Sequence, residues 1–235
     1  MLAGLTWADE QASSDDRSHW VAVSDAGILP IKSPAAAKQR LARDLDPGFH
    51  AAVVEALYLD ALDLCVASPG VTWLVVSDDG TVLQAAASRG LSTLRDAGAG
   101  LNPAVQEALS AVRAQGADAA LVIPSDVPLA RSHDIQDLLD TGATSDVVLV
   151  PSGADGGTNG LFMRPTDLLK PSFGPSSLQA HLQSVEATGS RCSVLPLARL
   201  ALDIDTIEDA HRLVKQPASE AMGRTERLLR EELAS

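Results

Sequence analysis

The sequence predicts an α/β protein with a mostly parallel sheet and helices on both faces. Short, mostly apolar runs such as Val71–Val76 and Ala119–Ile123 alternate with longer segments of helical periodicity. We count about six such runs, and their continuous apolar character is typical of strands covered on both sides. The 235 residues, of which 46% are hydrophobic, suffice for one sizeable core and are few for two complete domains.

The N-terminal region divides into an extension and the start of the folded domain. Residues 1–18 are polar and acidic, so we expect a flexible extension there, followed by one domain over residues 19–235. Residues 19–23 predict a short edge strand, and the small and polar residues of Ser24–Gly27 are typical of a turn.

The stretch Gly27–Ala42 has the layout of a phosphate-binding segment. An apolar strand, Ile28–Ile31, is followed by Lys32, a turn of small residues, Lys38 and Arg40, and then by helix formers. Such a layout can bind an anion, because backbone N–H groups at a helix start and lysine charges act together. The alternative is a helix that carries lysines for solubility. The sequence has neither the Rossmann G-x-G-x-x-G fingerprint nor the P-loop motif.

Helices and strands alternate through the next part of the chain. Helical spacing predicts a helix over Pro47–Ala67, which Ser68-Pro69-Gly70 ends. Asn102 is well placed to cap a helix over Pro103–Gln115, and capping competes with a ligand-binding role for it. The other elements predicted up to residue 150 are strands at Val71–Val76, Leu91–Leu94, Ala119–Ile123 and Asp146–Val150, and helices at Thr81–Arg89 and Ser132–Asp140.

Polar residues follow two of the predicted strands. Ser77-Asp78-Asp79-Gly80 comes directly after Val71–Val76, and Asp126 follows Ala119–Ile123 between two prolines. Open α/β sheets bind their ligands at the carboxyl ends of strands. We therefore favour a functional role for Asp126 over that of an ordinary turn former.

Two segments in the second half have features of anion sites. The loop Ser152–Gly160 is rich in glycine, and a strand at Leu161–Met163 resumes at once, which argues against a merely flexible loop. A helix predicted at Ser177–Thr188 follows a serine-rich turn, so its N-terminus either binds an anion or is simply capped by serine. His181 in this helix is more typical of a surface or structural histidine than of a catalytic one.

Acidic and apolar residues alternate near the C-terminus. A strand within Leu200–Asp209 would direct Asp203 and Asp205 to one face and Ile204 into the core. Two carboxylates side by side repel each other unless a cation lies between them, so the pair predicts a divalent metal site. The remaining predicted elements are a helix at Ile207–Lys215, begun by a capping box of Thr206 and Asp209, and an amphipathic helix within Ser219–Ser235.

Charge and cysteine content limit the partners and the compartment. Acidic residues outnumber basic ones by 31 to 18, a net charge of −13, which argues against nucleic acid and anionic membranes. A nucleotide substrate would therefore need divalent cations and local lysines. Cys65 and Cys192 lie in apolar surroundings, so we expect buried thiols in a reducing cytoplasm. No apolar run approaches the length of a membrane span.

Seven motifs occur in the order known from one enzyme family. They are Leu29-Pro-Ile-Lys32 with Ala36-Ala-Lys38-Gln-Arg40-Leu-Ala42, Ser77-Asp78-Asp79, Gly100-Leu-Asn102, Pro124-Ser-Asp126-Val-Pro128-Leu, Gly156-Gly-Thr158-Asn159, Phe173-Gly-Pro-Ser-Ser177 and Leu202-Asp203-Ile-Asp205-Thr-x-Glu-Asp209. From about Gly27 to His211 the chain thus resembles the guanylyltransferases of coenzyme F420 biosynthesis, a branch of the MobA-like nucleotidyltransferases. Ser125 and Gly160 depart mildly from the family pattern, in which alanine is common at both positions.

The resemblance implies a single-domain GT-A-like (Rossmann-like) nucleotidyltransferase that joins GTP to phosphoenolpyruvate or 2-phospho-L-lactate and releases pyrophosphate. It implies Mg²⁺ on Asp126, Asp203 and Asp205, and the catalytic residues it implies are Lys32, Lys38 and Asp126. The residues implied to bind the nucleotide are Pro30, Lys32, Lys38, Arg40, Ser77, Asp78, Gly100 and Asn102. Those implied to bind the phosphorylated acid are Thr158, Asn159, Gly174, Ser176 and Ser177.

Three other functions compete with this one. A related nucleotidyltransferase would act on 3-phosphoglycerate or a sugar phosphate, but Thr158 and Ser177 favour a compact phospho-acid over a sugar. A non-catalytic nucleotide-binding module would not need the lysines and aspartates to be intact. A Rossmann-like oxidoreductase is disfavoured because no glycine fingerprint follows the first strand. We expect a cytoplasmic enzyme without nucleic acid or membrane partners that can form a homodimer.

Overall fold

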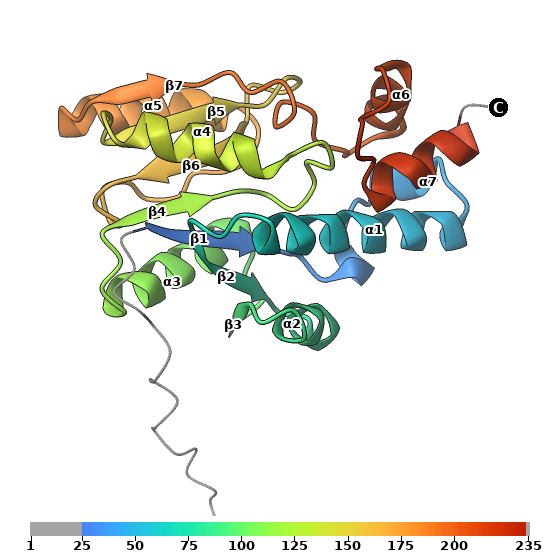
Figure 1. The fold of residues 1–235 in the computed structure, drawn as a ribbon, viewed down its shortest axis with the longest axis horizontal. Coiled ribbons are helices and arrows are strands. Elements are labelled where there is room, and N and C mark those ends of the chain that lie inside the picture. Colours follow the sequence, from blue (N-terminus) through green and yellow to red (C-terminus); the bar gives the residue numbers. More distant parts are fainter. Residues whose placement is uncertain (1–24, 234–235) are drawn as a thin grey trace, which may run out of the picture.

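Seven strands form a single sheet in the computed structural model, which describes residues 25–233 (Figure 1). The strands lie in the order β3-β2-β1-β4-β6-β5-β7. All neighbours are parallel except β6, which is antiparallel to β4 and to β5. The strands are β1 (Asp25–Pro30), β2 (Thr72–Ser77), β3 (Ser92–Arg95), β4 (Ala119–Val122), β5 (Val147–Pro151), β6 (Thr158–Met163) and β7 (Cys192–Val194). The predicted mostly parallel sheet is confirmed.

Helices cover both faces of this sheet, as predicted (Figure 1). The helices are α1 (Pro47–Val66), α2 (Gly80–Ala87), α3 (Leu101–Ala114), α4 (Ser132–Gly142), α5 (Ser177–Thr188), α6 (Ile207–Lys215) and α7 (Arg224–Leu233). On one face, α1, α2 and α4 contribute Leu62, Val82 and Leu138 to a buried cluster with the strands. On the other face, α3 and α5 contribute Val105 and Val185 to a second buried cluster.

A third buried cluster lies at the end of the sheet toward which β1 points, where α6 and α7 pack (Figure 1). It joins Leu57 of α1, Leu213 of α6 and Leu229 of α7 to Leu202 and Ile204. Burial of these apolar side chains holds the segment that carries Asp203 and Asp205 against the carboxyl ends of the central strands.

Most predicted elements are found close to their expected bounds, but the turn predicted at Ser24–Gly27 is wrong, because β1 begins at Asp25. A Cβ on Gly27 would come within 2.4 Å of Cε3 of Trp73, on the neighbouring strand β2. Glycine is therefore required here by close packing under an indole ring and not by a turn. The expectations for residues 1–18 and 19–23 concern the chain outside the described residues.

The basic stretch after β1 does not run straight into an α-helix, contrary to the prediction. Two short 3₁₀ turns, Pro34–Ala36 and Leu41–Arg43, follow β1, and α1 begins only at Pro47. Lys38 between them is left-handed, with φ of 49°. This backbone conformation interrupts a helix, so Lys38 and Arg40 do not lie at an α-helix N-terminus.

Several predictions for the C-terminal half also need correction. The segment Leu202–Asp205 is not a strand: it crosses the sheet edge, where the Ile204 N–H donates to the Asp126 carbonyl oxygen at 3.0 Å. The predicted strand Leu161–Met163 begins three residues earlier, at Thr158, and β7 was not predicted. Cys192 in β7 is half-buried, whereas Cys65 is buried as expected. No helix within residues 25–233 is long and apolar enough to cross a membrane.

Candidate active site

Two neighbouring cavities open at the carboxyl ends of β1, β2 and β4. One has a volume of about 270 Å³ and the other of about 320 Å³. Pro30, Ile31, Lys32 and Leu101 line both cavities. The smaller cavity is also lined by Lys38, Asp126 and Asp205, and the larger by Asp78, Asp96, Gly98 and Gly100. The structure thus brings together most of the residues predicted to bind a nucleotide.

Lys38 forms the central contact of the smaller cavity. Its Nζ lies 2.5 Å from Oδ2 of Asp126 and 2.6 Å from Oδ1 of Asp205, which are 88 and 167 residues away in the chain. Burial alone would lower the pKa of the Lys38 ammonium, but the two carboxylates outweigh burial and hold this pKa above its usual value. Lys38 is therefore a permanently charged, positioned cation.

Asp203 lies beside this cluster and has different partners. Its Oδ1 accepts hydrogen bonds from Asn159 Nδ2 at 2.9 Å and from Ser152 Oγ at 3.2 Å. Burial raises the pKa of the Asp203 carboxyl, and the negative charges of Asp126 and Asp205 raise it further, against the Asn159 hydrogen bond. Asp126 and Asp205 are therefore close enough to act electrostatically on Asp203, although Asp203 and Asp205 do not share a strand face.

The donor atoms at this edge suit a divalent cation such as Mg²⁺, because all of them are oxygens. Asp126 Oδ1 is buried and has no hydrogen-bond partner, a situation that a cation would relieve. Within residues 25–233, however, no three His, Cys, Asp or Glu side chains are grouped so that they could hold a metal ion. The Lys38 ammonium instead lies between two of the three predicted ligands. The magnesium site therefore stays a prediction.

Asn102 does not cap its helix, contrary to one of the two predictions for it. The cap of α3 is Gly100, with φ of 110°, and the helix begins at Leu101. The Asn102 side chain instead accepts from the Phe173 N–H at 2.7 Å and donates to the Phe173 carbonyl oxygen at 3.0 Å. It thereby ties the rim of the larger cavity to the loop that carries Gly174.

Two other residues predicted to bind the nucleotide do not line either cavity. Ser77 is buried, and its Oγ accepts from the Asp79 N–H at 3.1 Å, which shapes the turn after β2. Arg40 is exposed and lies outside the lining of both cavities. Asp96 was missed, although it follows β3 as Asp78 follows β2, so the strand-end rule could have found it.

Thr158 and Asn159 lie side by side at the start of β6 but face different parts of the site. Pro151 of β5 pairs with Thr158, and Val150 pairs with Gly160, so Asn159 is an extra residue in the ladder. Thr158 Oγ1 contacts Ser177 and His181 of α5, whereas Asn159 donates to the Leu200 carbonyl oxygen and to Asp203. The bulge therefore lets two successive residues of one strand contact different parts of the site, one the metal-ligand candidate Asp203 and the other the helix α5.

Three backbone amides at the start of α5 already have partners within the protein. The N–H groups of Ser176, Ser177 and Leu178 donate to the carbonyl oxygens of Asp155, Gly174 and Gly156. Ser176 is left-handed, with φ of 59°, and its side chain makes no capping hydrogen bond. The expected serine cap is therefore wrong, while the anion site at this helix start stays a prediction, with hydroxyl groups among its candidate donors.

Those hydroxyl groups belong to a buried network that includes His181. His181 Nδ1 lies 3.0 Å from Thr158 Oγ1, Ser177 Oγ lies 3.1 Å from Thr158 Oγ1, and the Ser172 N–H donates to His181 Nε2 at 3.2 Å. His181 is fully buried, and burial lowers the pKa of its imidazole to about 4. His181 is therefore neutral at physiological pH and is not a surface residue.

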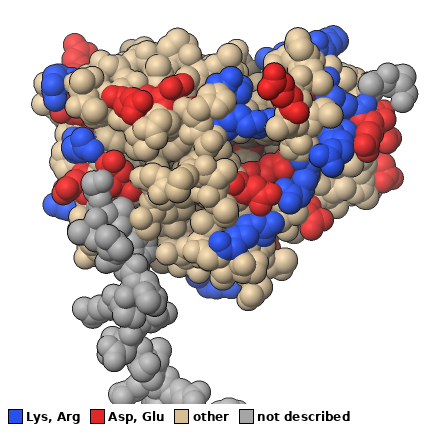
Figure 2. All heavy atoms as spheres, viewed as in Figure 1, with Lys and Arg blue, Asp and Glu red and all other residues tan. Residues whose placement is uncertain are grey.

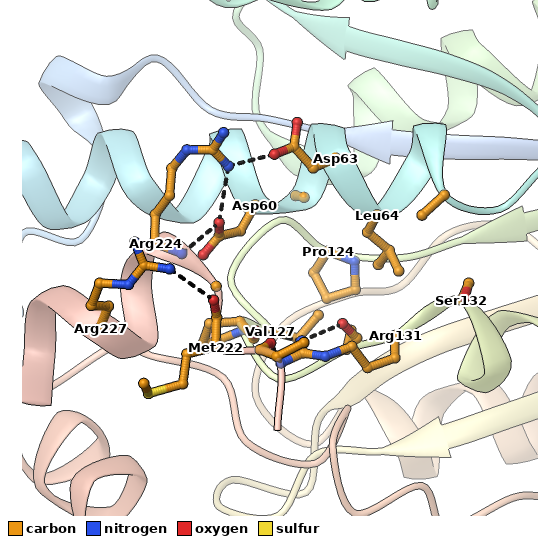
Figure 3. Close-up of a pocket in the computed structure, with 16 residues that line it drawn as sticks. Asp60, Asp63, Leu64, Pro124, Val127, Arg131, Ser132, Met222, Arg224 and Arg227 are labelled. Atoms are coloured by element: carbon orange, nitrogen blue, oxygen red, sulfur yellow. Dashed lines mark hydrogen bonds and ion pairs between the residues drawn. The ribbon is translucent and has the colours of Figure 1, made fainter. Parts of the chain in front are cut away.

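A third cavity, of about 470 Å³, lies between α1 and α7 (Figure 3). Arg224 contacts Asp60 and Asp63 of α1, and these ion pairs dock α7 onto α1 (Figure 3). Arg227 donates to the Met222 carbonyl oxygen (Figure 3). Across the face in Figure 2, Lys and Arg atoms are interspersed with Asp and Glu atoms and form no broad basic patch. This pattern is unlike a nucleic-acid interface.

Comparisons with known proteins find relatives over most of the chain. Residues 26–220 match the family model described as "Guanylyl transferase CofC like". A phosphoenolpyruvate guanylyltransferase from Rubrobacter xylanophilus is 36% identical over 79% of this chain and 91% of its own. A 3-phospho-D-glycerate guanylyltransferase from Phenylobacterium zucineum is 34% identical over 81% and 89%. A 2-phospho-L-lactate guanylyltransferase from Methanothermobacter thermautotrophicus is 33% identical over 80% and 82%.

Solved structures share the fold at lower identity. A Desulfovibrio desulfuricans protein, named as a candidate nucleotide-diphospho-sugar transferase, superposes with a TM-score of 0.73 at 17% identity. The match covers 90% of this chain and 96% of that one. This likeness supports the GT-A-like, Rossmann-like fold expected from the sequence.

Proposed function

This chain belongs to the CofC-like guanylyl transferase family, and from that premise we propose that it transfers GMP from GTP to a small phosphorylated three-carbon acid and releases pyrophosphate. Phosphoenolpyruvate is our first choice of acid, with 2-phospho-L-lactate and 3-phosphoglycerate as alternatives, and the product would enter coenzyme F420 biosynthesis. The observation that carries this proposal is the Lys38 ammonium, fixed between Asp126 and Asp205 beside a pair of cavities that fit a nucleotide.

The larger cavity suits a guanine base. Its lining carries two carboxylates, Asp78 and Asp96, together with the backbone of Gly98 and Gly100. Asp96 already accepts from the Gly98 N–H at 2.5 Å, whereas Asp78 is exposed at the cavity wall. Guanine presents its ring N–H and its amino group side by side, and a carboxylate can accept from both. We therefore assign base recognition to Asp78.

The smaller cavity suits the triphosphate, because Lys32 and Lys38 line it and can pair with the negative charges of the phosphates. Lys32 is exposed at the mouth of both cavities, and Lys38 is held in place by two carboxylates. Fixed cations aimed at phosphate oxygens stabilise the charge that develops as pyrophosphate leaves. The two carboxylates hold the pKa of Lys38 above its usual value, which suits an electrostatic role better than that of a general base.

The acid is held on the other side of the aspartates. Thr158 and Ser177 supply hydroxyl groups, and Gly174, at φ of 133°, lets the loop backbone pass close to a ligand. In the reaction, a phosphate oxygen of the acid bonds to the α-phosphorus of GTP, and the bond between the α-phosphorus and the bridging oxygen breaks. This nucleophile is already anionic, so positioning and charge neutralisation suffice without a strong base.

Magnesium would be held by Asp126, Asp203 and Asp205, and when bound it supplies charge neutralisation between the two anionic substrates. The residues themselves keep the ligand set in place: Asn159 and Ser152 orient Asp203, and the Ile204 N–H fixes the chain that joins Asp203 to Asp205. The buried, unpaired oxygen of Asp126 supports this assignment.

The test is pyrophosphate release with Mg²⁺, each of the four nucleoside triphosphates, and each of the three acids or a sugar phosphate in turn. We expect release with GTP and one acid only, and none when Mg²⁺ is replaced by a chelator. Release with a different nucleotide would overturn the base assignment. Release with a sugar phosphate but none of the three acids would overturn the acceptor assignment and leave the nucleotidyltransferase chemistry standing.

A further inference from the structure

We propose that His181 is a positioning residue that fixes the direction of the hydrogen bonds around Thr158 and Ser177, so that the hydroxyl pair must donate a hydrogen to an anionic oxygen of the acid substrate. This inference rests on the proposed function and deepens it. It assigns a role to a buried histidine that touches neither cavity and that the mechanism above does not use.

The tautomer of His181 follows from its backbone partner. The Ser172 N–H donates to His181 Nε2 at 3.2 Å, and a backbone N–H can only donate. Nε2 must therefore be unprotonated. Burial holds the pKa of His181 at about 4, so the ring is neutral and carries its hydrogen on Nδ1. His181 Nδ1 consequently donates to Thr158 Oγ1, 3.0 Å away.

The number of hydrogens in the network then leaves one free donor. Thr158 and Ser177 each have one hydroxyl hydrogen, and their oxygens lie 3.1 Å apart. Ser177 Oγ donates its hydrogen to Thr158 Oγ1, so the second hydrogen is that of the Thr158 hydroxyl. Because His181 donates to Thr158 and does not accept from it, the second hydrogen has no acceptor within the triad. The pair thus presents a donor, and it is oriented only while His181 holds its tautomer.

Such a donor discriminates between ligands. Thr158 is 6% exposed and Ser177 is 2% exposed, so little water competes for the hydrogen. A phosphate or carboxylate oxygen accepts it, whereas a ligand group that can only donate leaves it unpaired at a cost. The neutral ring adds no positive charge, so the site selects an acceptor by hydrogen-bond direction. A compact acid with many anionic oxygens fits this requirement.

A purely structural role is the alternative for His181. Its ring packs edge-on against Phe173, with centroids 5.3 Å apart, and it satisfies the Ser172 N–H. Loss of either contact would loosen the loop that carries Gly174, whatever the direction of the Thr158 bond. Two amide variants separate these roles, because an Asn amide nitrogen occupies the place of Nδ1 and a Gln amide oxygen can occupy that of Nε2.

The experiment compares wild type, His181→Asn and His181→Gln in the full chain. We expect His181→Gln to raise KM for the acid about tenfold, with KM for GTP unchanged, because the hydrogen bond to Thr158 is lost. Asn at this position should restore most of that loss, since it still donates to Thr158. Equal KM values for the acid in both variants, or a greater loss in His181→Asn, would overturn the positioning role.

Nuclear magnetic resonance of ¹⁵N-histidine-labelled wild type tests the tautomer directly and without turnover. A neutral Nδ1–H ring is the expected result, and a neutral Nε2–H ring would overturn the proposal. Calorimetric binding of phosphoenolpyruvate, 2-phospho-L-lactate and 3-phosphoglycerate in the presence of GTP completes the test. If none of the three acids binds or reacts, both the proposed function and the role of His181 are overturned. If an acid reacts but the two variants have equal KM values for it, only the role of His181 is overturned.

Discussion

The two halves of the site differ in how firmly their side chains are held. On the nucleotide side, beside β1 to β3, Lys32 and Asp78 are exposed and project into open cavities. On the acid side, beside β6 and α5, Thr158, Asn159 and Ser177 are all buried and hydrogen-bonded to one another or to the chain. A long, flexible triphosphate can organise side chains as it binds, whereas a compact acid gains affinity from groups that are already in place.

The boundary between the two halves is the cluster of Lys38, Asp126 and Asp205. It is half-buried, and its three charges come from distant parts of the chain. Here the contacts are electrostatic, and removing one charge leaves the others uncompensated. We therefore expect the largest effects of mutation at this boundary, intermediate effects beside it and smaller ones at the exposed nucleotide rim.

The comparison between the half-buried Lys38 and the exposed Lys32 gives the largest expected effect. Lys38→Met should lower kcat/KM on the order of a thousandfold, because it removes a fixed cation and leaves two carboxylates facing each other. Lys32→Met is the matched control, and it should cost only about tenfold because Lys32 is exposed to solvent. Steady-state pyrophosphate release measures both. Equal losses in the two variants would show that Lys38 is only one more phosphate-binding cation.

Substitution of Asp203 tests whether the acid half of the site takes part in binding the metal. Asp203→Asn keeps the size of the side chain but removes its charge, and we expect kcat to fall on the order of a hundredfold. The Mg²⁺ concentration needed for half-maximal rate should rise in parallel, which a loss of packing alone would not cause. Circular dichroism checks that the fold is kept. A near-wild-type rate at ordinary Mg²⁺ would contradict the assignment of Asp203 as a metal ligand.

The exposed nucleotide rim should control selectivity more than rate. Asp78→Asn replaces a two-acceptor carboxylate with an amide, and we expect the preference for GTP over ATP to fall about tenfold. KM for the acid should not change, because Asp78 belongs to the other half of the site. The ratio of kcat/KM values for the two nucleotides gives the result. An unchanged preference would move base recognition to Asp96 or to the loop backbone.

Local patterns in the sequence predicted the helices and strands well, but they did not predict side-chain contacts between residues far apart in the chain. Periodicity gave α1 and the central strands, and the strand-end rule pointed to Asp78 and Asp126. The contacts of Lys38 and the bond from Asn102 to Phe173 join residues that are 71 to 167 positions apart, so no local pattern could reveal them. The resemblance to a known family pointed to those residues, but it did not say which of them contact one another.

Two further errors had tertiary causes. The pattern around Ile204 suggested a strand, and Ile204 is indeed buried, but its backbone bonds to the turn at Asp126 and not to a neighbouring strand. The serine-rich turn suggested a serine cap for α5, yet the Ser176 side chain makes no capping bond, and carbonyl oxygens of the preceding loops accept from the first amides of the helix. In both cases competing partners from elsewhere in the fold decided the outcome.

The smallest expected effect concerns the stability of the acid half. The pKa of His181 is about 4 in the folded protein, against a usual value of 6.5, because the ring is buried. Between these values the unfolded chain binds a proton that the folded chain does not, so stability falls as pH falls through this window. Wild type should therefore lose about 1–2 kcal/mol more than His181→Gln between roughly pH 7.5 and pH 5.

Urea unfolding of both proteins at the two pH values measures this difference, and the other titrating groups cancel because both chains share them. If the two proteins lose stability equally, the imidazole is not held neutral, its Nε2 can carry a hydrogen, and the bond to the Ser172 N–H that fixes the direction of the network is lost.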